Sequence, residues 1–505
     1  MGNVRNVLEY LERSAEEYPD KLAYAGSSGS YSFKEIMAVS RSVGTYLAGV
    51  VEKGSPVAVY MEKSAQQIAA FFGTAYAGAF YAPIDVKMPP QRVKLILDTL
   101  EAGCMIVDAK SAGRAEELGF AGRIINFDDI SGTEADLPRL EQIRRASIDS
   151  DPLYAIFTSG STGVPKGVLI SQRSAVNFTE WYCNAFSHDN ETVFGNQTPF
   201  YFDASVKQIY ATIRCGATMY IIPRMLFSFP IKLIEYLNDH KINCIDWVPS
   251  ALCIITKFNT FEKIMPKYLK KVIFGADVMP TKQYNIWKKA LPDVMYGNTY
   301  GPTEITVDCC YYIVDRELKD SEPIPIGRAC ENTDVMILNE KNELVKQGEI
   351  GELCVRGVSL ALGYYNNQEK TDSVFVQNPL QKHYRELMYR TGDLAKYNEY
   401  GEIIYVARKD FQIKHMGHRI ELGEIETALG AVEGIQRACC LYEKSSEKII
   451  AVYEGEATRA DIINSVKTAL PKYMIPNVYH QLDQIPLNMN GKIDRVALTK
   501  EFVRE

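Results

Sequence analysis

The sequence predicts an α/β protein: a large N-terminal domain with two helix-covered, mainly parallel sheets and a small β-barrel-like unit, then a small α+β C-terminal domain. Three observations predict this architecture. From about residue 20 to residue 310, short apolar runs alternate with helical patterns, as in parallel sheets covered by helices. From Val335 to Tyr405 the strand-like runs become closely spaced and are separated by Gly and Asn turns. The remaining segment has helix and strand patterns of its own.

The first expected element is an amphipathic surface helix that Pro19 ends, which is not the pattern of a signal peptide. A charge-free run from Ala65 to Ile84 closes on Pro83 and predicts a buried helix that enters a strand rather than a membrane span. The apolar runs expected to form the parallel sheets are PVAVYM, FYAPID, CMIVDA, RIINFD, TMYIIP, NCIDWVP and KKVIFGA.

The second half predicts two smaller units. The runs DVMILN, GELCVRG and EIIYVAR predict a β-rich unit at about 310–409, within a large domain that covers 1–409. A separate domain over 411–505 is expected to contain a helix from Glu424 to Val432, the strands RACCLYE and KIIAVYE, and a helix opened by a capping box from Thr458 to Asp461.

Composition narrows the possible partners. The chain has 505 residues, with 56 Lys and Arg against 63 Asp and Glu and a net charge of −7. Neither sign gathers in long runs, so a nucleic-acid or membrane surface is not expected. Eleven cysteines without a CxxC pattern predict free thiols and a cytoplasmic protein. The oligomeric state is left open.

The segment FTSGSTGVPKGV, Phe157 to Val168, follows an apolar strand. Its glycines can free backbone N–H groups for an anion, and its hydroxyls and Lys166 add donors, as a polyphosphate site requires. A flexible turn of small residues is the alternative. The order of residues differs from a P-loop, because Lys166 precedes Gly167 and no GK[ST] sequence is present.

Five further motifs follow in order: NTYGPTE from Asn298, YRTGD from Tyr389, RKDFQIK from Arg408, GHRIELGEIE from Gly417 and NGKIDR from Asn490. Together with the first segment they resemble the adenylate-forming superfamily, which includes acyl-CoA synthetases, luciferases and the adenylation domains of nonribosomal peptide synthetases. The resemblance covers essentially the whole chain. It implies two substrates, an acid and ATP with Mg²⁺, and a mobile C-terminal domain.

The resemblance assigns a role to each motif, and the residue types suit those roles. Tyr300 would stack on adenine, Glu304 would bind Mg²⁺ together with phosphate oxygens, and Asp393 would accept hydrogen bonds from the two ribose hydroxyls. Arg408 would lie beside ribose and phosphate as a fixed cation. A core tyrosine, a solvated glutamate and a structural salt bridge are the respective alternatives.

Other positions follow from the same motifs. Lys492, in an NGK turn, would hold the substrate carboxylate and the α-phosphate together, and Asp410 would be the hinge before the C-terminal domain. An exposed turn lysine and a plain linker aspartate are the alternatives. The remaining catalytic and ATP-binding assignments are Thr158, Lys166, Ser159, Gly160, Ser161, Thr162, Gly163, Asn298, Thr299, Gly301 and Thr303.

The stretch FYFDASVKQIY, from Phe200, resembles the segment of amino-acid-activating members that carries an aspartate for the α-ammonium group, here Asp203. A helix-capping aspartate is the alternative. The side-chain pocket expected from the family comprises Ala204, Lys207, Trp247, Ile273, Gly275, Thr299, Val307 and Asp308. Lys207 predicts a polar or acidic α-amino acid, although Asp308 could neutralise it, and an aromatic substrate lying on Trp247 is the rival.

The expected reaction is amino acid adenylation followed by transfer to the phosphopantetheine thiol of a separate carrier protein. D-Alanine:carrier protein ligases are similar in length, but they typically place a Cys where this chain has Gly275. A CoA ligase for a small acid is the second alternative, and Asp203 argues against it. A catalytically silent adenylate-binding module is the third, and the presence of Lys166, Glu304 and Lys492 argues against that.

Overall fold

The computed structural model describes residues 4–160, 164–409, 412–486 and 493–503. Two compact units divide the chain. The first consists of Met1–Val86, Leu100–Ile156 and Gly167–Lys409, and the second of Lys87–Thr99, Phe157–Lys166 and Asp410–Glu505. The second unit therefore contains two segments, Lys87–Thr99 and Phe157–Lys166, that lie within the large domain predicted from the sequence.

One mainly parallel sheet lies largely in the first unit. Within the described residues it has seven strands in the order β18-β8-β7-β4-β3-β5-β6. Its central strands β3, β4 and β5 are buried along their whole length, as expected for a sheet covered on both faces. The strands are β3 (Pro56–Tyr60), β4 (Phe80–Ile84), β5 (Cys104–Val107), β6 (Arg123–Asn126), β7 (Pro152–Thr158), β8 (Lys166–Ser171) and β18 (Gly363–Tyr364).

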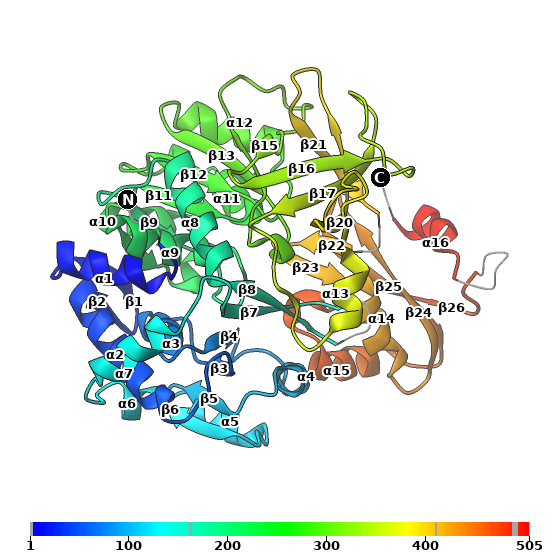
Figure 1. Cartoon of the computed structure of the whole chain (residues 1–505). Helices are drawn as coiled ribbons and strands as arrows, with labels where there is room; N and C mark the ends of the chain where they lie inside the picture. The colour runs from blue at the N-terminus through cyan, green and yellow to red at the C-terminus, as the bar shows by residue number, and fades with distance from the viewer. Residues whose placement is uncertain (1–3, 161–163, 410–411, 487–492, 504–505) are drawn as a thin grey trace. The chain divides into compact units, whose positions relative to one another are not determined.

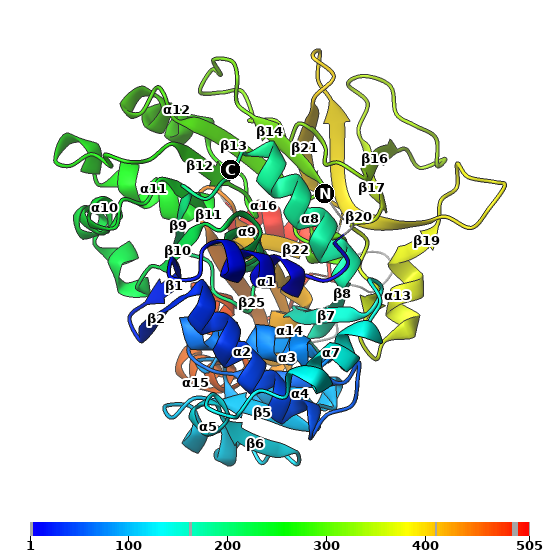
Figure 2. The ribbon, with the colours of Figure 1, turned by 60° about the vertical axis from the view of Figure 1, so that its left-hand side comes forward.

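Helices α2 (Phe33–Ala48) and α3 (Ala65–Tyr76) pack side by side in this unit (Figures 1 and 2). Two glycines permit the close approach, because a Cβ on Gly44 would lie 2.6 Å from the Cβ of Tyr76, and one on Gly73 would lie 2.5 Å from Val43. Three further helices connect strands β5, β6 and β7 along the chain: α5 (Ala112–Glu117), α6 (Phe127–Ile130) and α7 (Leu137–Arg145).

A second sheet carries most of the candidate site. Among the described residues it has nine strands in the order β15-β14-β13-β12-β11-β9-β10-β1-β2, parallel from β13 to β1. The strands are β1 (Leu22–Gly26), β2 (Gly29–Ser32), β9 (Val193–Asn196), β10 (Thr218–Ile221), β11 (Cys244–Trp247), β12 (Lys271–Phe274), β13 (Met295–Tyr300), β14 (Cys310–Ile313) and β15 (Arg328–Ala329). The helices between them are α8 (Gln172–Ala185), α9 (Ser205–Cys215), α10 (Pro230–Asp239), α11 (Pro249–Lys257) and α12 (Thr281–Ala290), after α1 (Leu8–Glu17).

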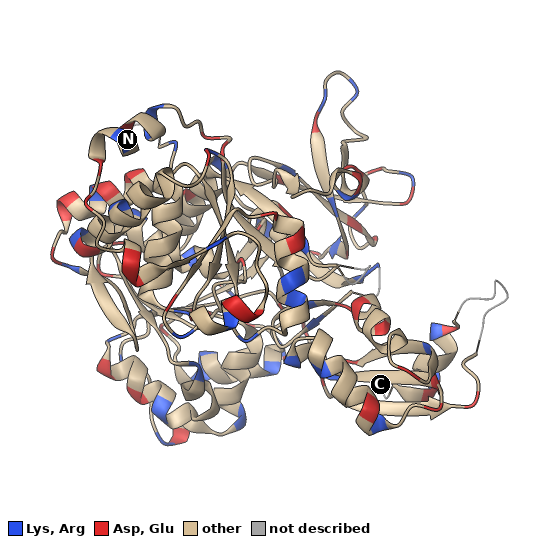
Figure 3. Ribbon diagram, turned by 90° about the horizontal axis from the view of Figure 1, so that it is seen from below, with Lys and Arg blue, Asp and Glu red and all other residues tan. Residues whose placement is uncertain are grey.

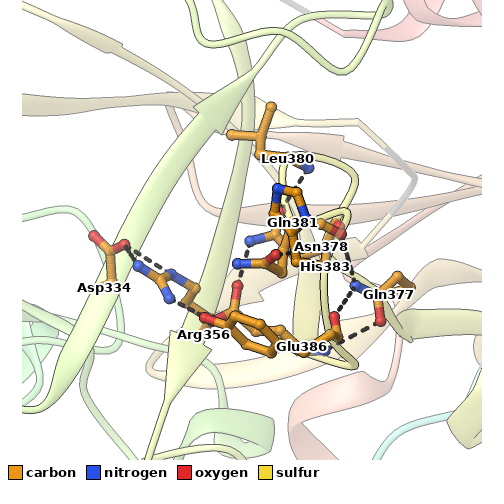
Figure 4. Close-up of polar contacts among 9 residues, drawn as sticks. Asp334, Arg356, Gln377, Asn378, Leu380, Gln381, His383 and Glu386 are labelled. Atoms are coloured by element: carbon orange, nitrogen blue, oxygen red, sulfur yellow. Dashed lines mark hydrogen bonds and ion pairs between the residues drawn. The ribbon is translucent and has the colours of Figure 1, made fainter.

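The β-rich part forms an antiparallel sheet of five strands within the described residues: β16 (Thr333–Leu338), β17 (Gly351–Gly357), β19 (Phe375–Gln377), β20 (Leu387–Tyr397) and β21 (Ile403–Arg408), with α13 (Gln368–Val374). Arg356 on β17 bonds to Asp334 on β16 and to Glu386 just before β20 (Figure 4). Asn378 donates to the same Glu386 over 2.6 Å. These contacts tie the loop after β19 to the sheet.

The C-terminal elements of the second unit are β22 (Gln412–His415), β23 (His418–Glu421), α14 (Leu422–Gly430), β24 (Ile435–Glu443), β25 (Lys448–Gly455), α15 (Arg459–Ala469), β26 (Val478–Leu482) and α16 (Arg495–Phe502). Ile425, Ala451 and Val466 lie in their core. Within the same unit, Arg92 of α4 (Pro90–Leu100) forms a buried ion pair with Glu424. Burial raises the pKa of Glu424, and Arg92 opposes that shift.

Several sequence expectations are confirmed. The charge-free run forms α3 and then β4, both buried, and among the described residues no helix has the length and apolarity needed to cross a bilayer. The Thr458 hydroxyl caps α15 by accepting from the Asp461 N–H. All eleven cysteines, each in a described range, are free thiols. Residues of both charge signs are interspersed over the ribbon (Figure 3).

Candidate active site

The first cluster joins three residues that the motifs assign to ATP. The Tyr300 hydroxyl donates to Asp393, whose other oxygen accepts from Arg408 at 3.2 Å. Asp393 and Arg408 are cross-strand neighbours on β20 and β21, and Arg408 also donates to the Thr391 carbonyl at 2.7 Å. Tyr300 and Asp393 are buried, and burial, followed by the Asp393 charge, raises the pKa of Tyr300.

This cluster keeps capacity for a nucleotide. Each carboxylate oxygen can accept about two hydrogen bonds, so Asp393 can accept from ribose hydroxyls while it holds Tyr300 and Arg408. The structure therefore brings together the residue types that a nucleoside requires: an aromatic ring, a carboxylate and a guanidinium. Their binding roles stay predictions.

Glu304 is buried in a short 3₁₀ helix, Thr303–Ile305. Its Oε1 accepts a hydrogen bond of 2.6 Å from the Tyr364 hydroxyl. Within the described ranges, no group of three or more His, Cys, Asp or Glu side chains could hold a metal ion. A single carboxylate that shares Mg²⁺ with phosphate oxygens fits this arrangement, whereas a resident metal centre built by these side chains does not.

The opening loop is described at its two ends only, since Ser161, Thr162 and Gly163 lie outside the described residues. Thr158 ends β7, and its buried hydroxyl has no hydrogen-bond partner in the part of the chain that the structure describes. Within the second unit, the Ser159 hydroxyl donates to the Arg419 carbonyl at 2.9 Å, and Lys166 lies 4.0 Å from Glu421. An unsatisfied buried hydroxyl is costly unless a ligand pairs with it.

Gly160 is required by the path of this loop. A Cβ at this position would lie 2.1 Å from the Val164 carbonyl oxygen, so any other residue would force the backbone apart. The same holds for Gly301 in NTYGPTE, where a Cβ would lie 2.3 Å from the Val307 carbonyl oxygen. Both glycines therefore shape the two loops that the resemblance assigns to the nucleotide.

The second cluster lies at the start of α9 and is centred on Lys207. Its Nζ lies 2.9 Å from Asp308 Oδ2 and 3.3 Å from Asp246 Oδ2, and it donates to the Thr299 hydroxyl at 2.9 Å. All four residues are buried. Tyr182 donates to Asp246 at 2.9 Å. One ammonium group thus faces two carboxyl groups, and Asp308 does neutralise Lys207.

These residues correct the predicted pocket, because Trp247 does not belong to it. On β11, Asp246 is paired with Ile273 and Trp247 with Phe274 of β12. Side chains alternate between the faces of a sheet, so Asp246 shares the face of Ile273. Trp247 packs on the other face against Phe227 and donates to the Gly195 carbonyl at 2.7 Å.

The remaining pocket positions are shaped by close packing. A Cβ on Gly275 would lie 2.5 Å from the Thr299 hydroxyl oxygen. Thr306 and Val307 both have left-handed backbone, with φ of +58° and +75°, which is strained for β-branched residues. The Thr306 hydroxyl donates to the Ser359 carbonyl at 2.8 Å and holds this turn. The hydroxyl of Thr299, which the sequence assigns both to ATP and to the pocket, accepts a hydrogen bond from Lys207.

Asp203 lies two residues before Ser205, the first residue of α9, and is partly exposed. It accepts from the Ala204 N–H at 2.7 Å and from the Thr303 hydroxyl. The surrounding protein removes water from this carboxyl group and thereby raises its pKa. The N-cap of α9 is Ala204, which makes no side-chain cap bond, and the N–H that Asp203 accepts at this helix start is that of Ala204. Among the described residues, no cation lies within ion-pair distance of Asp203.

The two clusters share one segment. Thr299 contacts Lys207, Tyr300 contacts Asp393, and Thr303 contacts Asp203. Asn298 instead donates to the Pro325 carbonyl at 2.8 Å, so its amide supports the strand. Asp246 and Tyr364 are site residues that the sequence did not predict: Asp246 lies one position before the predicted Trp247, and no motif marks Tyr364. Lys492 and Asp410 lie outside the described residues.

A family model described as AMP-binding enzyme matches residues 11–365. The chain is 31% identical over 503 residues to zwittermicin A synthase ZmaJ of Bacillus cereus, an alignment that covers 97% of this chain and 94% of that protein. The chain belongs to the AMP-binding enzyme family. It is an adenylate-forming enzyme of the type found in nonribosomal peptide synthetases, and such enzymes use ATP.

Other AMP-binding relatives are much longer. Tyrocidine synthase 1 of Brevibacillus parabrevis is 32% identical over 503 residues, which cover 98% of this chain but 45% of that protein. For gramicidin S synthase 2 of Aneurinibacillus migulanus the identity is 32% over 507 residues, and the alignment covers 98% of this chain and 11% of the relative. The chain thus spans less than half the length of these two relatives.

Solved structures confirm the fold of this AMP-binding enzyme. The structure of holo-PA1221, an NRPS protein containing adenylation and PCP domains, aligns with a TM-score of 0.85 at 22% identity and covers 99% of this chain and 85% of that chain. The o-succinylbenzoate CoA synthetase MenE of Bacillus subtilis aligns with a TM-score of 0.84 at 18% identity, covering 97% and 98%. Carrier-linked and CoA-dependent proteins therefore share this architecture.

Proposed function

We propose that this enzyme activates an α-amino acid with ATP and then transfers the aminoacyl group to the phosphopantetheine thiol of a separate carrier protein. The first step joins the substrate carboxylate to the α-phosphorus of ATP and releases pyrophosphate. The mixed anhydride that results is attacked by the thiol, and AMP leaves. The observation that carries this proposal is the carboxyl group of Asp203.

Asp203 has the properties of an anchor for an α-ammonium group. It is partly exposed, it lies in surroundings that disfavour its charge, and within the described residues no cation lies within ion-pair distance of it, although the more distant Lys207 acts to lower its pKa. A bound ammonium group would supply the missing charge and restore the ionised carboxylate. Fatty and aryl acids lack that group and would leave the carboxylate uncompensated.

The side-chain pocket supports a polar substrate. A buried polar cluster lies at the first turn of α9, four residues after Asp203. It consists of Lys207, Asp246, Asp308 and Thr299. The ammonium group of Lys207 can donate three hydrogen bonds, and these protein groups already use them. A polar substrate side chain would exchange with one of them, whereas an acidic side chain would add a third carboxyl group beside a single ammonium group. The aromatic alternative loses its basis, because Trp247 packs on the other face of β11.

The charge that develops during adenylation would be met by residues of several motifs. Lys166 and Lys492 would balance the substrate carboxylate and phosphate oxygens, and the Thr158 hydroxyl would donate to a phosphate. Tyr300, Asp393 and Arg408 would hold the nucleoside. Mg²⁺, held by Glu304 and phosphate oxygens, would neutralise part of the triphosphate charge.

The carrier and CoA alternatives need separate support. The similarity to proteins named tyrocidine synthase 1 and holo-PA1221 favours a carrier as the acceptor. The similarity to MenE leaves CoA as the second candidate, because the fold serves both. Asp203 favours the first, since a CoA ligase for a simple acid would not need an ammonium anchor.

The test is an amino-acid-dependent ATP–pyrophosphate exchange panel with the twenty standard amino acids and their D-forms. We expect exchange with polar amino acids, and a loss of roughly 10²–10³-fold in Asp203→Asn, because the bound ammonium group would lose its counter-charge and an enclosed ion pair that loses one partner costs about 3–5 kcal/mol. The exposed Asp293 offers a matched control in Asp293→Asn. Undiminished exchange in Asp203→Asn, or better exchange with acids that lack the amino group, contradicts the proposal.

A further inference from the structure

The segment that carries Asp203 joins β9 to α9 and runs from Gln197 to Ala204. These residues, all of them described, form turns and bends, and the last four, from Tyr201 to Ala204, are partly exposed. Irregular backbone of this kind keeps one conformation only where contacts from neighbouring elements hold it. The position of the Asp203 carboxyl group therefore depends on how this segment is held.

The N-terminal half of the segment is held by Lys63, which follows β3. Its ammonium group donates to the Gln197 carbonyl at 3.1 Å and to the Asn196 carbonyl at 3.5 Å. The same nitrogen lies over the Phe200 ring, 5.3 Å from its centre, a distance at which a cation is attracted to an aromatic face. One ammonium group thus contacts both the beginning and the middle of the segment.

Two buried amides close the base of the segment. Asn196 Nδ2 donates to Gln208 Oε1 at 2.9 Å, so the last residue of β9 is joined to the first turn of α9. Phe200 is buried and packs edge-on against Phe71 of α3, with 6.0 Å between the ring centres. Lys63 contacts the resulting loop between its closed base and Asp203.

No ion pair balances the charge of Lys63 within the described residues. The adjacent Glu62 pairs with Lys110 at 3.4 Å, Asp108 accepts from the Glu62 N–H at 2.7 Å, and α3 carries no charged residue. Lys63 is partly exposed, but the surrounding protein removes water from its ammonium group and lowers its pKa to about 7. The charged groups of the segment and of the first turn of α9 are Asp203 and Lys207.

We propose that Lys63 is a positioning residue for the amino acid: through Gln197 and Phe200 it holds the segment so that the Asp203 carboxyl group stays where the α-ammonium group binds. This inference rests on the function proposed above for Asp203. In this role Lys63 acts through the segment and not on the reacting atoms. Its loss should weaken amino acid binding and leave ATP binding unchanged, because the nucleotide cluster is built on other strands.

Two substitutions separate the charge of Lys63 from its bulk. Lys63→Met removes the charge and the donors, whereas Lys63→Arg keeps both. In amino-acid-dependent pyrophosphate exchange, we expect the KM for the amino acid to rise roughly tenfold in Lys63→Met and to stay within roughly threefold of the wild type in Lys63→Arg. The KM for ATP should not change in either variant. An unchanged KM for the amino acid in Lys63→Met would overturn the inference.

Lys288 offers a matched control in the same unit. Its ammonium group also donates to a backbone carbonyl, that of Pro292 at 2.7 Å, and lies 5.4 Å from the centre of the Tyr296 ring. These contacts belong to α12 and the residues after it, not to the segment. Lys288→Met should therefore change neither KM, and an equal rise in both methionine variants would show a general structural effect instead of positioning.

A pH profile gives a readout that a purely structural role would not move. Between about pH 6 and about pH 8.5, Lys63 loses its proton and with it the charge that strengthens its hydrogen bonds. We expect the KM of the wild type for the amino acid to rise roughly three- to tenfold over this range. Arginine stays protonated, so the KM of Lys63→Arg should rise less. Asp308 titrates in both proteins, and identical profiles would contradict the role of Lys63.

Hydrogen exchange tests the positioning without any substrate. In the free protein at about pH 6.5, the amides of residues 197–204 should exchange roughly fivefold or more faster in Lys63→Met than in the wild type. A peptide from α12 should be unaffected, as should the segment in Lys288→Met. Equal exchange of residues 197–204 in Lys63→Met and the wild type would refute the inference. A wild type without amino-acid-dependent pyrophosphate exchange would refute the proposed function, whereas hydrogen exchange would still decide whether Lys63 holds the segment.

Discussion

Lys207 illustrates how a buried charge can be satisfied without a ligand. Its ammonium group faces Asp308 and Asp246, and burial raises the pKa of Asp308 to about 6, with Lys207 acting in the opposite direction. The net charge of Lys207, Asp246 and Asp308 is therefore zero when Asp308 is protonated and −1 when Asp308 is ionised. A substrate side chain must compete with these internal contacts, which makes the pocket selective for groups that can replace them.

The raised pKa of Asp308 predicts a pH-dependent stability. The folded protein holds this proton to a higher pH than the unfolded chain, whose aspartate pKa is about 3.9. The group therefore destabilises the folded state increasingly as the pH rises from about 4 to about 6. Asparagine does not titrate, so this loss is absent in Asp308→Asn. We therefore expect the free energy of unfolding of the variant, relative to that of the wild type, to rise by roughly 2–3 kcal/mol between pH 4 and pH 7.

Urea unfolding at several pH values measures this difference. The quantity to compare is the free energy of unfolding of Asp308→Asn minus that of the wild type, because other acidic groups titrate in both proteins. Asp293→Asn should show a constant difference over the same range. A constant difference for Asp308→Asn as well would show that the pKa of Asp308 is not raised in the folded protein.

Gly275 carries a prediction about packing. A Cβ there would lie 2.5 Å from the Thr299 hydroxyl oxygen and 2.7 Å from the Thr299 carbonyl oxygen, so Gly275→Ala must displace Thr299 of β13, whose hydroxyl accepts from Lys207. We expect a loss of about 1–3 kcal/mol in stability and reduced amino-acid-dependent pyrophosphate exchange. Gly132→Ala, where a Cβ meets nothing within 4 Å, should change neither quantity; equal behaviour of the two variants would refute the steric argument.

At the scale of elements, strand β11 decides which residues form the pocket. Its side chains alternate, and its register with β12 directs Asp246 toward Lys207 and Trp247 toward the opposite core. The sequence NCIDWVP contains both residues side by side, so a shift of one position exchanges an acidic group for an aromatic one. Pairing with Ile273 resolves this ambiguity.

This alternation predicts different effects for two adjacent substitutions. Asp246→Asn should alter the relative activity toward different amino acids in pyrophosphate exchange, because it removes one of the two acidic partners of Lys207. Trp247→Phe should lower stability by about 1–2 kcal/mol through loss of the bond to the Gly195 carbonyl, with selectivity unchanged. If Trp247→Phe altered the amino acid selectivity and Asp246→Asn left it unchanged, Trp247 rather than Asp246 would line the pocket.

At the scale of the whole molecule, the chain divides where the resemblance expects a hinge. The first unit ends at Lys409, and the second unit takes up the chain again from Asp410. The second unit also includes the ends of the opening loop, where Ser159 and Lys166 lie near Arg419 and Glu421 of GHRIELGEIE. The predicted hinge and the predicted boundaries at 409 and 411 stay predictions.

Proline substitution tests this hinge. Proline fixes φ and removes the N–H, so Asp410→Pro should restrict a change of backbone conformation while leaving the residues of each site intact. We expect pyrophosphate exchange to survive and thioester formation with pantetheine to slow by roughly tenfold or more. Asp410→Ala, which keeps backbone freedom, should carry out both steps. Equal loss of both steps in Asp410→Pro would remove the hinge from the mechanism.

Much of this molecule could be predicted before its structure was known, and the limits have physical causes. Local periodicity and caps located α3, β4 and α15, because these signals lie within a few neighbouring residues. The motifs placed Tyr300, Asp393 and Arg408 in one site, and the structure brings them together. The contact of Tyr364 with Glu304 could not be predicted, because it joins residues that are distant in the chain.

The sequence by itself determined the α/β class, the order of the elements and the motif residues of an adenylate-forming enzyme. Tertiary structure alone decided that Asp246 rather than Trp247 faces Lys207 and that Lys207 is neutralised. The physical reason is that periodicity specifies how a segment folds, whereas strand register and helix packing specify which face of it meets another segment.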